Sequence, residues 1–398
     1  MNPFKNLDIK NYHALKFIVI LGIVSLFADM TYEGARSITG SYLAVLGASA
    51  VTVGFVAGFG EFLGYGLRLL SGYWMDKTGR YWFIAILGYF INLLAVPLIG
   101  FTTTWQLVAI LIILERVGKA IRSPAKDAML SHAGHQVGMG LGFGIHEALD
   151  QIGAMLGPLI VALALYLKYG YQFSFIILIV PAMAAISMLF FARKQYPNPR
   201  ELEIKVVHLK IHSHLKLFWI YLLGAAFVAA GFIDFPLMAF HFQDQHIFSP
   251  VLIPLAYALS MGMDAIFSPI LGYCYDRFGF VTLIIVTVIS ALFSPLVFLT
   301  HDVVFIYLGI ALWAIGIGSQ SSIMRAVVGK ITPIDKRASY YGLFNLGFGL
   351  AWFLGSVTLG FMYQHSILGM VILSVGLQLL ALPFLFIAFF NTKKLSLR

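Results

Sequence analysis

The sequence predicts an all-α integral membrane protein with twelve transmembrane helices, arranged as two six-helix, pseudo-symmetric bundles around a central cavity. Three observations predict this fold. The chain of 398 residues is 60% hydrophobic and only 11% charged, whereas soluble proteins carry roughly 25% charged residues. Its apolar residues fall into runs of about 20, the length that crosses a bilayer as a helix. A charged, glycine-containing motif also occurs twice, 200 positions apart.

Twelve apolar runs follow one another along the chain, six on each side of one long polar segment. This polar segment, residues 193–216, predicts a linker between an N-terminal bundle of residues 1–192 and a C-terminal bundle of residues 217–398. The first six runs are residues 17–38, 49–73, 81–101, 105–127, 137–166 and 172–192. The second six are residues 217–241, 249–274, 280–300, 303–328, 338–363 and 366–391.

Charged residues divide the predicted helices into two kinds. Runs three, six, nine and twelve have no charged residue in their interior, while runs one, two, four and five carry many. Charge inside a membrane must face protein or water, so we expect every third helix to face lipid and the others to surround a polar cavity. Lysine and arginine gather in alternate breaks, which places both termini in the cytoplasm. The net charge of +9 therefore reflects topology, and we expect a lipid bilayer as partner and no nucleic acid.

The repeated motif lies between runs two and three and again between runs eight and nine. Its glycines allow a tight turn and close approach of the backbone. We expect Asp76 to lie just before the third helix, where a negative charge suits the helix N-terminus. The motif residues are Gly72, Asp76, Lys77, Gly79 and Arg80 in the first copy and Gly272, Asp276, Arg277 and Gly279 in the second.

These features resemble the major facilitator superfamily. Its loop between helices two and three has the pattern Gly-x-x-x-Asp-Arg/Lys-x-Gly-Arg, which residues 72–80 match and residues 272–279 repeat in a weaker form. The resemblance spans the whole chain and implies a transporter of a small-molecule substrate. It also implies that the motif acts as a cytoplasmic gate, which closes in one state and breaks in the other; a helix cap with topogenic charges is the alternative.

Two further features resemble the drug:proton antiporters of that superfamily. Asp29 looks like their acidic residue in helix one, and the fifth run looks like their glycine-proline signature, with Val161 and Ala162 in place of its last glycines. Small residues also let helices pack closely, which is the alternative role for this set. The signature residues are Gly144, Gly153, Gly157 and Pro158.

Carboxylates inside the apolar runs are candidates for proton coupling. Asp29 lies about twelve residues into the first run, roughly 18 Å along a helix and so near the bilayer midplane, and Glu33 follows one turn later. Glu147 and Asp150 lie at i,i+3 in the fifth run. In a low dielectric, such a carboxylate can carry a proton when its partner leaves. Contact with a cationic substrate and a structural ion pair are the alternatives for Asp29.

Other charged residues in the runs predict the lining of a substrate cavity. Arg116, Lys119 and Arg122 suggest a substrate with an anionic group, zwitterionic or amphiphilic, although each can also serve as an ion-pair partner. The single cysteine and the scattered histidines predict no metal site, and we expect no cofactor. The cavity residues are Arg36, Glu61, Arg116, Lys119, Arg122, His146, Asp234 and Arg325.

The sequence thus predicts a proton-coupled secondary active transporter that moves a small organic solute by alternating access. We expect an exporting antiporter that is a monomer in the bacterial inner membrane. A proton-coupled uptake symporter for an anionic or zwitterionic solute is the alternative, and a non-transporting membrane receptor on the same fold is a remoter one. An enzyme is not expected, because the sequence has no clustered histidines and no phosphate-binding glycine loop.

Overall fold

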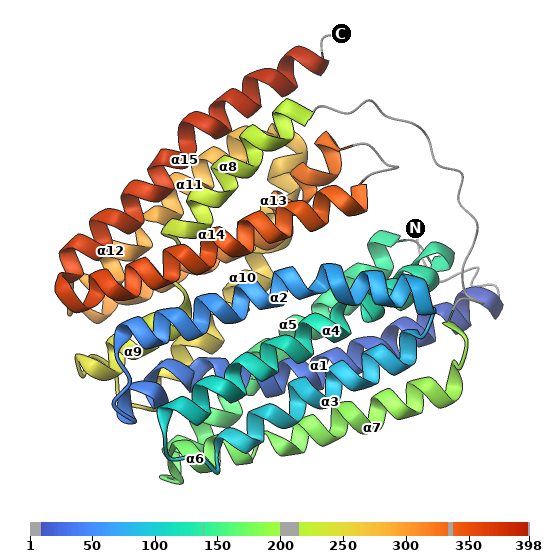
Figure 1. The fold of residues 1–398 in the computed structure, drawn as a ribbon, viewed down its shortest axis with the longest axis horizontal. Coiled ribbons are helices and arrows are strands. Elements are labelled where there is room, and N and C mark those ends of the chain that lie inside the picture. Colours follow the sequence, from blue (N-terminus) through green and yellow to red (C-terminus); the bar gives the residue numbers. More distant parts are fainter. Residues whose placement is uncertain (1–8, 138, 200–214, 333–336, 397–398) are drawn as a thin grey trace. The chain divides into compact units, whose positions relative to one another are not determined.

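The computed structural model describes residues 9–137, 139–199, 215–332 and 337–396, and the regular structure in these ranges is helical. Figure 1 shows the helices coloured along the chain. The helices of the first half of the sequence are α1 (Ile9–Val45), α2 (Ala50–Thr78), α3 (Tyr81–Ile99), α4 (Trp105–Val137), α5 (Met139–Tyr166), α6 (Gly170–Ile176) and α7 (Ile179–Gln195). Those of the second half are α8 (Leu215–Gly231), α9 (Phe235–Asp244), α10 (Leu252–Phe278), α11 (Phe280–Ala291), α12 (Phe293–Phe298), α13 (Val303–Ile331), α14 (Arg337–His365) and α15 (Ile367–Ser396).

The predicted fold of twelve transmembrane helices is confirmed. Within the described ranges, eleven segments are long and apolar enough to cross a bilayer. The twelfth is α4, which has the length but also carries four charged residues between Glu115 and Arg122. Glu115, Arg116 and Arg122 are buried, so these charges face protein instead of lipid.

Three of the predicted runs are each divided into two helices, which the sequence analysis did not predict. The breaks separate α6 from α7, α8 from α9, and α11 from α12. Each break is followed within a few residues by a proline: Pro181, Pro236 or Pro295. A proline lacks the N–H group and its ring clashes with the carbonyl group four residues earlier, so it ends or kinks a helix at that point.

The chain forms two compact units, each described by itself. Unit 1 comprises Met1–Ala35, Leu67–Thr102 and Ile110–Val207; unit 2 comprises Arg36–Gly66, Thr103–Ala109 and His208–Arg398. The core of unit 1 packs the first part of α1 with α3, α4 and α7, while in unit 2 α8 packs against α14 and α15, and α10 against α13. Most of the predicted linker, residues 200–214, lies outside the described residues, and the division into halves at this linker stays a prediction.

Glycines bring helix backbones into direct contact in both units. In unit 1, a Cβ atom on Gly157 of α5 would lie 2.2 Å from the carbonyl oxygen of Met30 on α1. In unit 2, a Cβ atom on Gly355 of α14 would lie 2.1 Å from the carbonyl oxygen of Ala230 on α8. No side chain fits at either position. Gly153 is equally close to α1 and Pro158 is buried, whereas Gly144 is exposed and a Cβ atom there would meet nothing within 4 Å.

Candidate functional site

The two copies of the glycine motif end α2 and α10 in the same way. Gly79 and Gly279 have φ angles of 64° and 63°, in the left-handed region that favours glycine. Their N–H groups donate to the carbonyl oxygens of Met75 and Tyr275, both at 2.7 Å. The expected position of Asp76 just before the third helix is wrong, because α2 continues to Thr78 and Asp76 lies in its last turn.

The motif side chains that the structure describes face outward. Lys77, Arg80, Asp276 and Arg277 are exposed, and the side chain of Asp76 lies outside the described part of the chain. Gly72 lies inside α2, where a Cβ atom would be 3.7 Å from Cβ of Pro124. The gating role of these residues stays a prediction.

A cluster of charged side chains lies in unit 1 where α1, α4 and α5 meet; we call it the α1–α4–α5 cluster. Helical spacing explains how the sequence forms it, because residues three or four apart lie on one helix face. Asp29 and Glu33 are one turn apart on α1, and His146 and Asp150 are one turn apart on α5. Its members are Asp29, Glu33, Lys119, Arg122, Lys126, His146 and Asp150.

Asp150 is the centre of a polar chain in this cluster. Its Oδ2 atom lies 3.7 Å from Nζ of Lys126 and 3.4 Å from Nδ1 of His146, and Nε2 of His146 lies 2.9 Å from Oγ of Ser25. In the tautomer with its proton on Nδ1, His146 donates to Asp150 and accepts from the Ser25 hydroxyl. Oδ1 of Asp150 is buried without a geometric hydrogen-bond partner among the described residues, while the Ser25 side chain also interacts with the Asp150 carboxylate.

Two tyrosines stack on the cations of the cluster. The Nζ atom of Lys119 lies 3.8 Å from the ring centroid of Tyr32, and Cζ of Arg122 lies 4.4 Å from that of Tyr89. Cation–π attraction of this kind holds a cation in place without neutralising it. Sequence reasoning missed both tyrosines. Tyr32 follows Asp29 by three residues, which was an available signal, whereas Tyr89 lies in an uncharged run and gave none.

The charges of the cluster balance. With the seven members in their usual states, the three carboxylates Asp29, Glu33 and Asp150 offset the three cations Lys119, Arg122 and Lys126, with His146 neutral. Asp127, whose side chain is 57% exposed, also lies 3.9 Å from Lys126 at the edge of the cluster. Asp29 is 7% exposed. It interacts electrostatically with four charged neighbours: Asp150, Glu33, Lys119 and Arg122. One added proton therefore gives a buried site a net charge of +1, which low-dielectric surroundings penalise.

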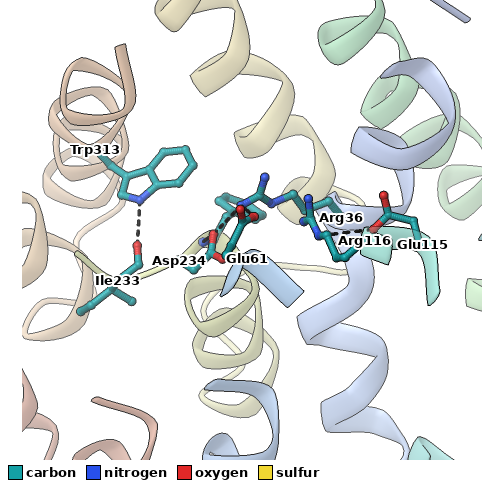
Figure 2. A network of polar contacts seen from close by, with 8 residues as sticks. Arg36, Glu61, Glu115, Arg116, Ile233, Asp234 and Trp313 are labelled. Carbon is teal, nitrogen blue, oxygen red and sulfur yellow. Dashed lines mark hydrogen bonds and ion pairs between the residues drawn. The ribbon is translucent and has the colours of Figure 1, made fainter. Parts of the chain in front are cut away.

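Two other predicted site residues lie on α4 and α5, and Arg116 is close enough for its charge to act on Lys119. Arg116 pairs with Glu115 at 3.3 Å (Figure 2), and Glu115 accepts a hydrogen bond from Nδ2 of Asn92 at 2.6 Å. Glu147 is exposed, and its Oε1 accepts from Nε2 of Gln151 at 3.2 Å. The structure thus does not bring Glu147 into the cluster.

A second charged group lies in unit 2 and joins three helices. Nη2 of Arg36 on α1 lies 3.2 Å from Oε1 of Glu61 on α2 and 2.8 Å from Oδ1 of Asp234 (Figure 2). Asp234 also caps α9, because Oδ1 accepts from the N–H of Phe235 at 2.9 Å. Nε1 of Trp313 donates to the carbonyl oxygen of Ile233 at 2.9 Å and holds the chain before this cap (Figure 2).

A cavity of about 140 Å³ adjoins this second group within unit 2. Arg36 and Glu61 line it together with aromatic residues of α2 and α14 and polar residues of α13. Sequence reasoning predicted both charged residues as cavity lining but missed the aromatic and amide residues, because nothing in an apolar run marks which side chains face a cavity. The side chain of Arg325, also predicted here, lies outside the described residues.

Twelve membrane-crossing segments with buried charge on several of them are typical of membrane transport proteins. The model of the Major Facilitator Superfamily matches residues 20–356 and again residues 235–397. The chain belongs to this superfamily and is a secondary transporter; its family and fold are those of transporters and not of enzymes.

Similar proteins and one similar solved structure match nearly the whole chain. An uncharacterized protein of Mycobacterium tuberculosis is 39% identical over 380 residues, which cover 94% of this chain and 93% of that protein. An uncharacterized MFS-type transporter of Methanocaldococcus jannaschii is 29% identical over 365 residues, 88% of this chain and 89% of that protein. The crystal structure of a bacterial homolog of the human lysosomal transporter Spinster, inward-facing and unoccupied, matches with a TM-score of 0.73 at 16% identity, covering 96% and 98% of the two chains.

Proposed function

We propose that this transporter is coupled to protons and exports a small organic solute as an antiporter, by alternating access. The observation that carries the proposal is the balanced, buried α1–α4–α5 cluster. Charge is costly inside a membrane and is retained where it serves an ion or substrate pathway. A cluster with zero net charge responds to a single proton, since gaining or losing one leaves an uncompensated charge.

Asp150 and Asp29 are the proposed proton carriers. A proton on Oδ1 of Asp150 removes the negative charge that Lys126 faces at 3.7 Å, so the contact between α4 and α5 weakens. His146 and Ser25 continue the polar chain from Asp150 to α1. A proton that arrives along this chain therefore changes the contacts of all three helices at once, which is what coupling to a conformational change requires.

Alternating access is supported by a close contact in unit 2 between segments from the two halves of the sequence. A Cβ atom on Gly40 of α1 would lie 1.8 Å from the carbonyl oxygen of Pro236, and Oγ of Ser41 donates to the carbonyl oxygen of Ala239 at 3.1 Å. The positive-inside rule puts these segments on the non-cytoplasmic side. We propose that this contact and the Arg36 ion pairs close the outer side, and that the motif at residues 72–80 closes the cytoplasmic side.

Internal repetition supports the proposed division into two halves joined by residues 193–216. Gly79 and Gly279 share their φ angle and their capping bond. The superfamily model also matches a second time from residue 235. We propose that the protein acts as a monomer in the cell membrane, with both termini in the cytoplasm.

The uptake symporter for an anionic or zwitterionic solute is less well supported. Such a solute needs a surplus of positive charge, and the cations at the α1–α4–α5 cluster and beside it have carboxylate partners. Arg116 pairs with Glu115, and Lys126 faces Asp150. Export by exchange with a proton needs no such surplus.

A flux measurement tests the proposal. Purified protein is first screened by thermal shift against drugs, siderophores, sugar acids and amino-acid derivatives, and a compound that raises the melting temperature is then loaded into proteoliposomes. Proton coupling predicts that an imposed pH gradient drives the compound against its own gradient and that proton counter-flow accompanies it. Flux that is equally fast with and without the pH gradient contradicts proton coupling.

A further inference from the structure

A cavity of about 840 Å³ lies in unit 1 where α3 begins and α7 ends. These two helices pack side by side (Figure 1). The cavity is at the first residues of one membrane-crossing segment, Tyr81–Ile99, and at the last residues of another, Gly170–Gln195. It therefore lies at the depth of the lipid headgroups, and the positive-inside rule puts this end of both segments on the cytoplasmic side.

Hydrogen bonds and ring packing hold the walls of this cavity together. Nε1 of Trp82, in the first turn of α3, donates to the carbonyl oxygen of Tyr196 at 2.9 Å. The hydroxyl group of Tyr196 donates to the carbonyl oxygen of His13 on α1 at 3.1 Å, and its ring centroid lies 4.8 Å from that of Phe17. The chain that follows α7 is thus fixed against α3 and α1, so the cavity is built by specific contacts.

Three cations and no carboxylate belong to the lining of the cavity. Arg80 immediately precedes α3, and Arg193 and Lys194 lie in the last turn of α7. All three side chains are exposed, and none of them has an ion-pair partner among the described side chains. Guanidinium groups bind phosphate oxygens through paired hydrogen bonds. The charge of the lining therefore favours an anionic ligand.

Apolar side chains line the same cavity on its membrane side. Phe83 lies three residues after Arg80 on α3, and Phe190 lies three residues before Arg193 on α7. Each phenylalanine is thus about one turn deeper in the membrane than the arginine of its helix. Phe83 is 53% exposed and Phe190 is 44% exposed, on helices that the sequence predicts to face lipid. A ligand that fits has an anionic end and an apolar body.

We propose that this cavity binds the headgroup of an anionic phospholipid, with its phosphate at the three cations and its acyl chains along Phe83 and Phe190. Its volume is within the range of roughly 300–1,000 Å³ that is typical of ligand pockets. Basic pockets between transmembrane helices on the cytoplasmic side are suited to such headgroups. A soluble phosphate compound offers the same anionic oxygens but nothing that covers the two phenylalanines. The site goes beyond the proposed transport function, and lipid binding is measured without transport.

Two lipids with the same acyl chains test the charge requirement. Dioleoyl phosphatidylglycerol has an anionic headgroup, whereas dioleoyl phosphatidylcholine has a zwitterionic one. Native mass spectrometry of the protein, purified in an uncharged detergent, measures the Kd of the first bound lipid. We expect phosphatidylglycerol to bind at least about tenfold more tightly, because each basic residue at such a site contributes about a factor of five. Equal affinities of the two lipids overturn the proposal.

Glycerol 1-phosphate separates the lipid from a soluble phosphate compound, because it carries the phosphate without acyl chains. We expect it to leave bound phosphatidylglycerol in place when both are present at the same concentration, since it cannot cover the apolar part of the cavity. Displacement of the lipid by glycerol 1-phosphate under these conditions overturns the assignment of a lipid.

Variants place the binding in this cavity. Arg193→Gln combined with Lys194→Gln should weaken the binding of phosphatidylglycerol about 25-fold, about fivefold for each cation. Lys216→Gln combined with Arg277→Gln is the matched control, because it removes two exposed cations from the ends of α8 and α10 in unit 2; it should change the Kd less than about twofold. The melting temperature without added lipid checks that each variant is folded. Unchanged binding in the folded Arg193→Gln, Lys194→Gln protein, or an equal loss in the control, overturns the proposal.

Discussion

Replacing Arg36 by methionine removes the cation that joins α1, α2 and α9 in unit 2. Nη2 of Arg36 lies 2.8 Å from Asp234 and 3.2 Å from Glu61, and the side chain of Asp234 is 3% exposed. Removing one partner of a buried ion pair costs about 3–5 kcal/mol, because a charge remains buried without compensation. Since Glu61 keeps some access to water, at 15% exposure, we expect the lower end, a loss of about 3 kcal/mol in the free energy of unfolding.

The measurement is equilibrium unfolding of the purified protein in mixed micelles. Arg36→Met combined with Glu61→Gln and Asp234→Asn removes all three charges while Oδ1 of residue 234 can still cap α9, and it should recover about 2 kcal/mol of the loss. Arg193→Met, at an exposed position near the end of α7, is the control and should be within about 0.5 kcal/mol of the unmodified protein. A triple variant no more stable than Arg36→Met refutes the reasoning, because buried uncompensated charge would then not be the cause.

Three other predictions follow from the packing and the α1–α4–α5 cluster. Gly157→Leu should abolish monodisperse protein on size-exclusion chromatography, because even a Cβ atom lies 2.2 Å from the Met30 carbonyl oxygen, while Gly144→Leu at an exposed position should leave the yield unchanged. Gly79→Ala should lower the free energy of unfolding by about 1–2 kcal/mol, because its φ of 64° disfavours a side chain; an effect below about 0.3 kcal/mol contradicts this. Lys126→Met should lower the free energy of unfolding by about 2–3 kcal/mol, because Asp150 loses the cation at 3.7 Å. Asp150→Asn in the same protein should restore most of this loss. A double variant that is less stable than Lys126→Met shows that the ion pair is not the source of the lost stability.

The sequence predicts much of the fold because the bilayer imposes a length and a polarity on every crossing segment. What the sequence does not predict is where individual helices break and end. The breaks before Pro181, Pro236 and Pro295 divide runs that hydropathy treats as continuous, because proline changes the backbone without making a run less apolar. The position of Asp76 was wrong for a related reason: the glycine that ends α2 is Gly79, the second of the motif, and Gly72 remains helical.

The candidate site was predicted where its residues share one helix and missed where it depends on packing between helices. Spacing alone groups Asp29 with Glu33 and His146 with Asp150. The stacking of Arg122 on Tyr89 and the unpaired amide of Gln320 depend on how each helix is rotated against its neighbour. Hydrophobic periodicity gives little information on that rotation when a helix is apolar on all sides.

The most direct test of proton coupling compares two transport modes in proteoliposomes for the unmodified protein and Asp29→Asn. Exchange of labelled for unlabelled solute at equal pH needs alternating access but no net proton movement, whereas accumulation against a gradient needs a titrating carboxylate. Proton coupling through the α1–α4–α5 cluster predicts that Asp29→Asn keeps exchange and loses accumulation driven by the pH gradient. Accumulation at the unmodified rate in a folded Asp29→Asn protein contradicts the role of Asp29 as a proton carrier.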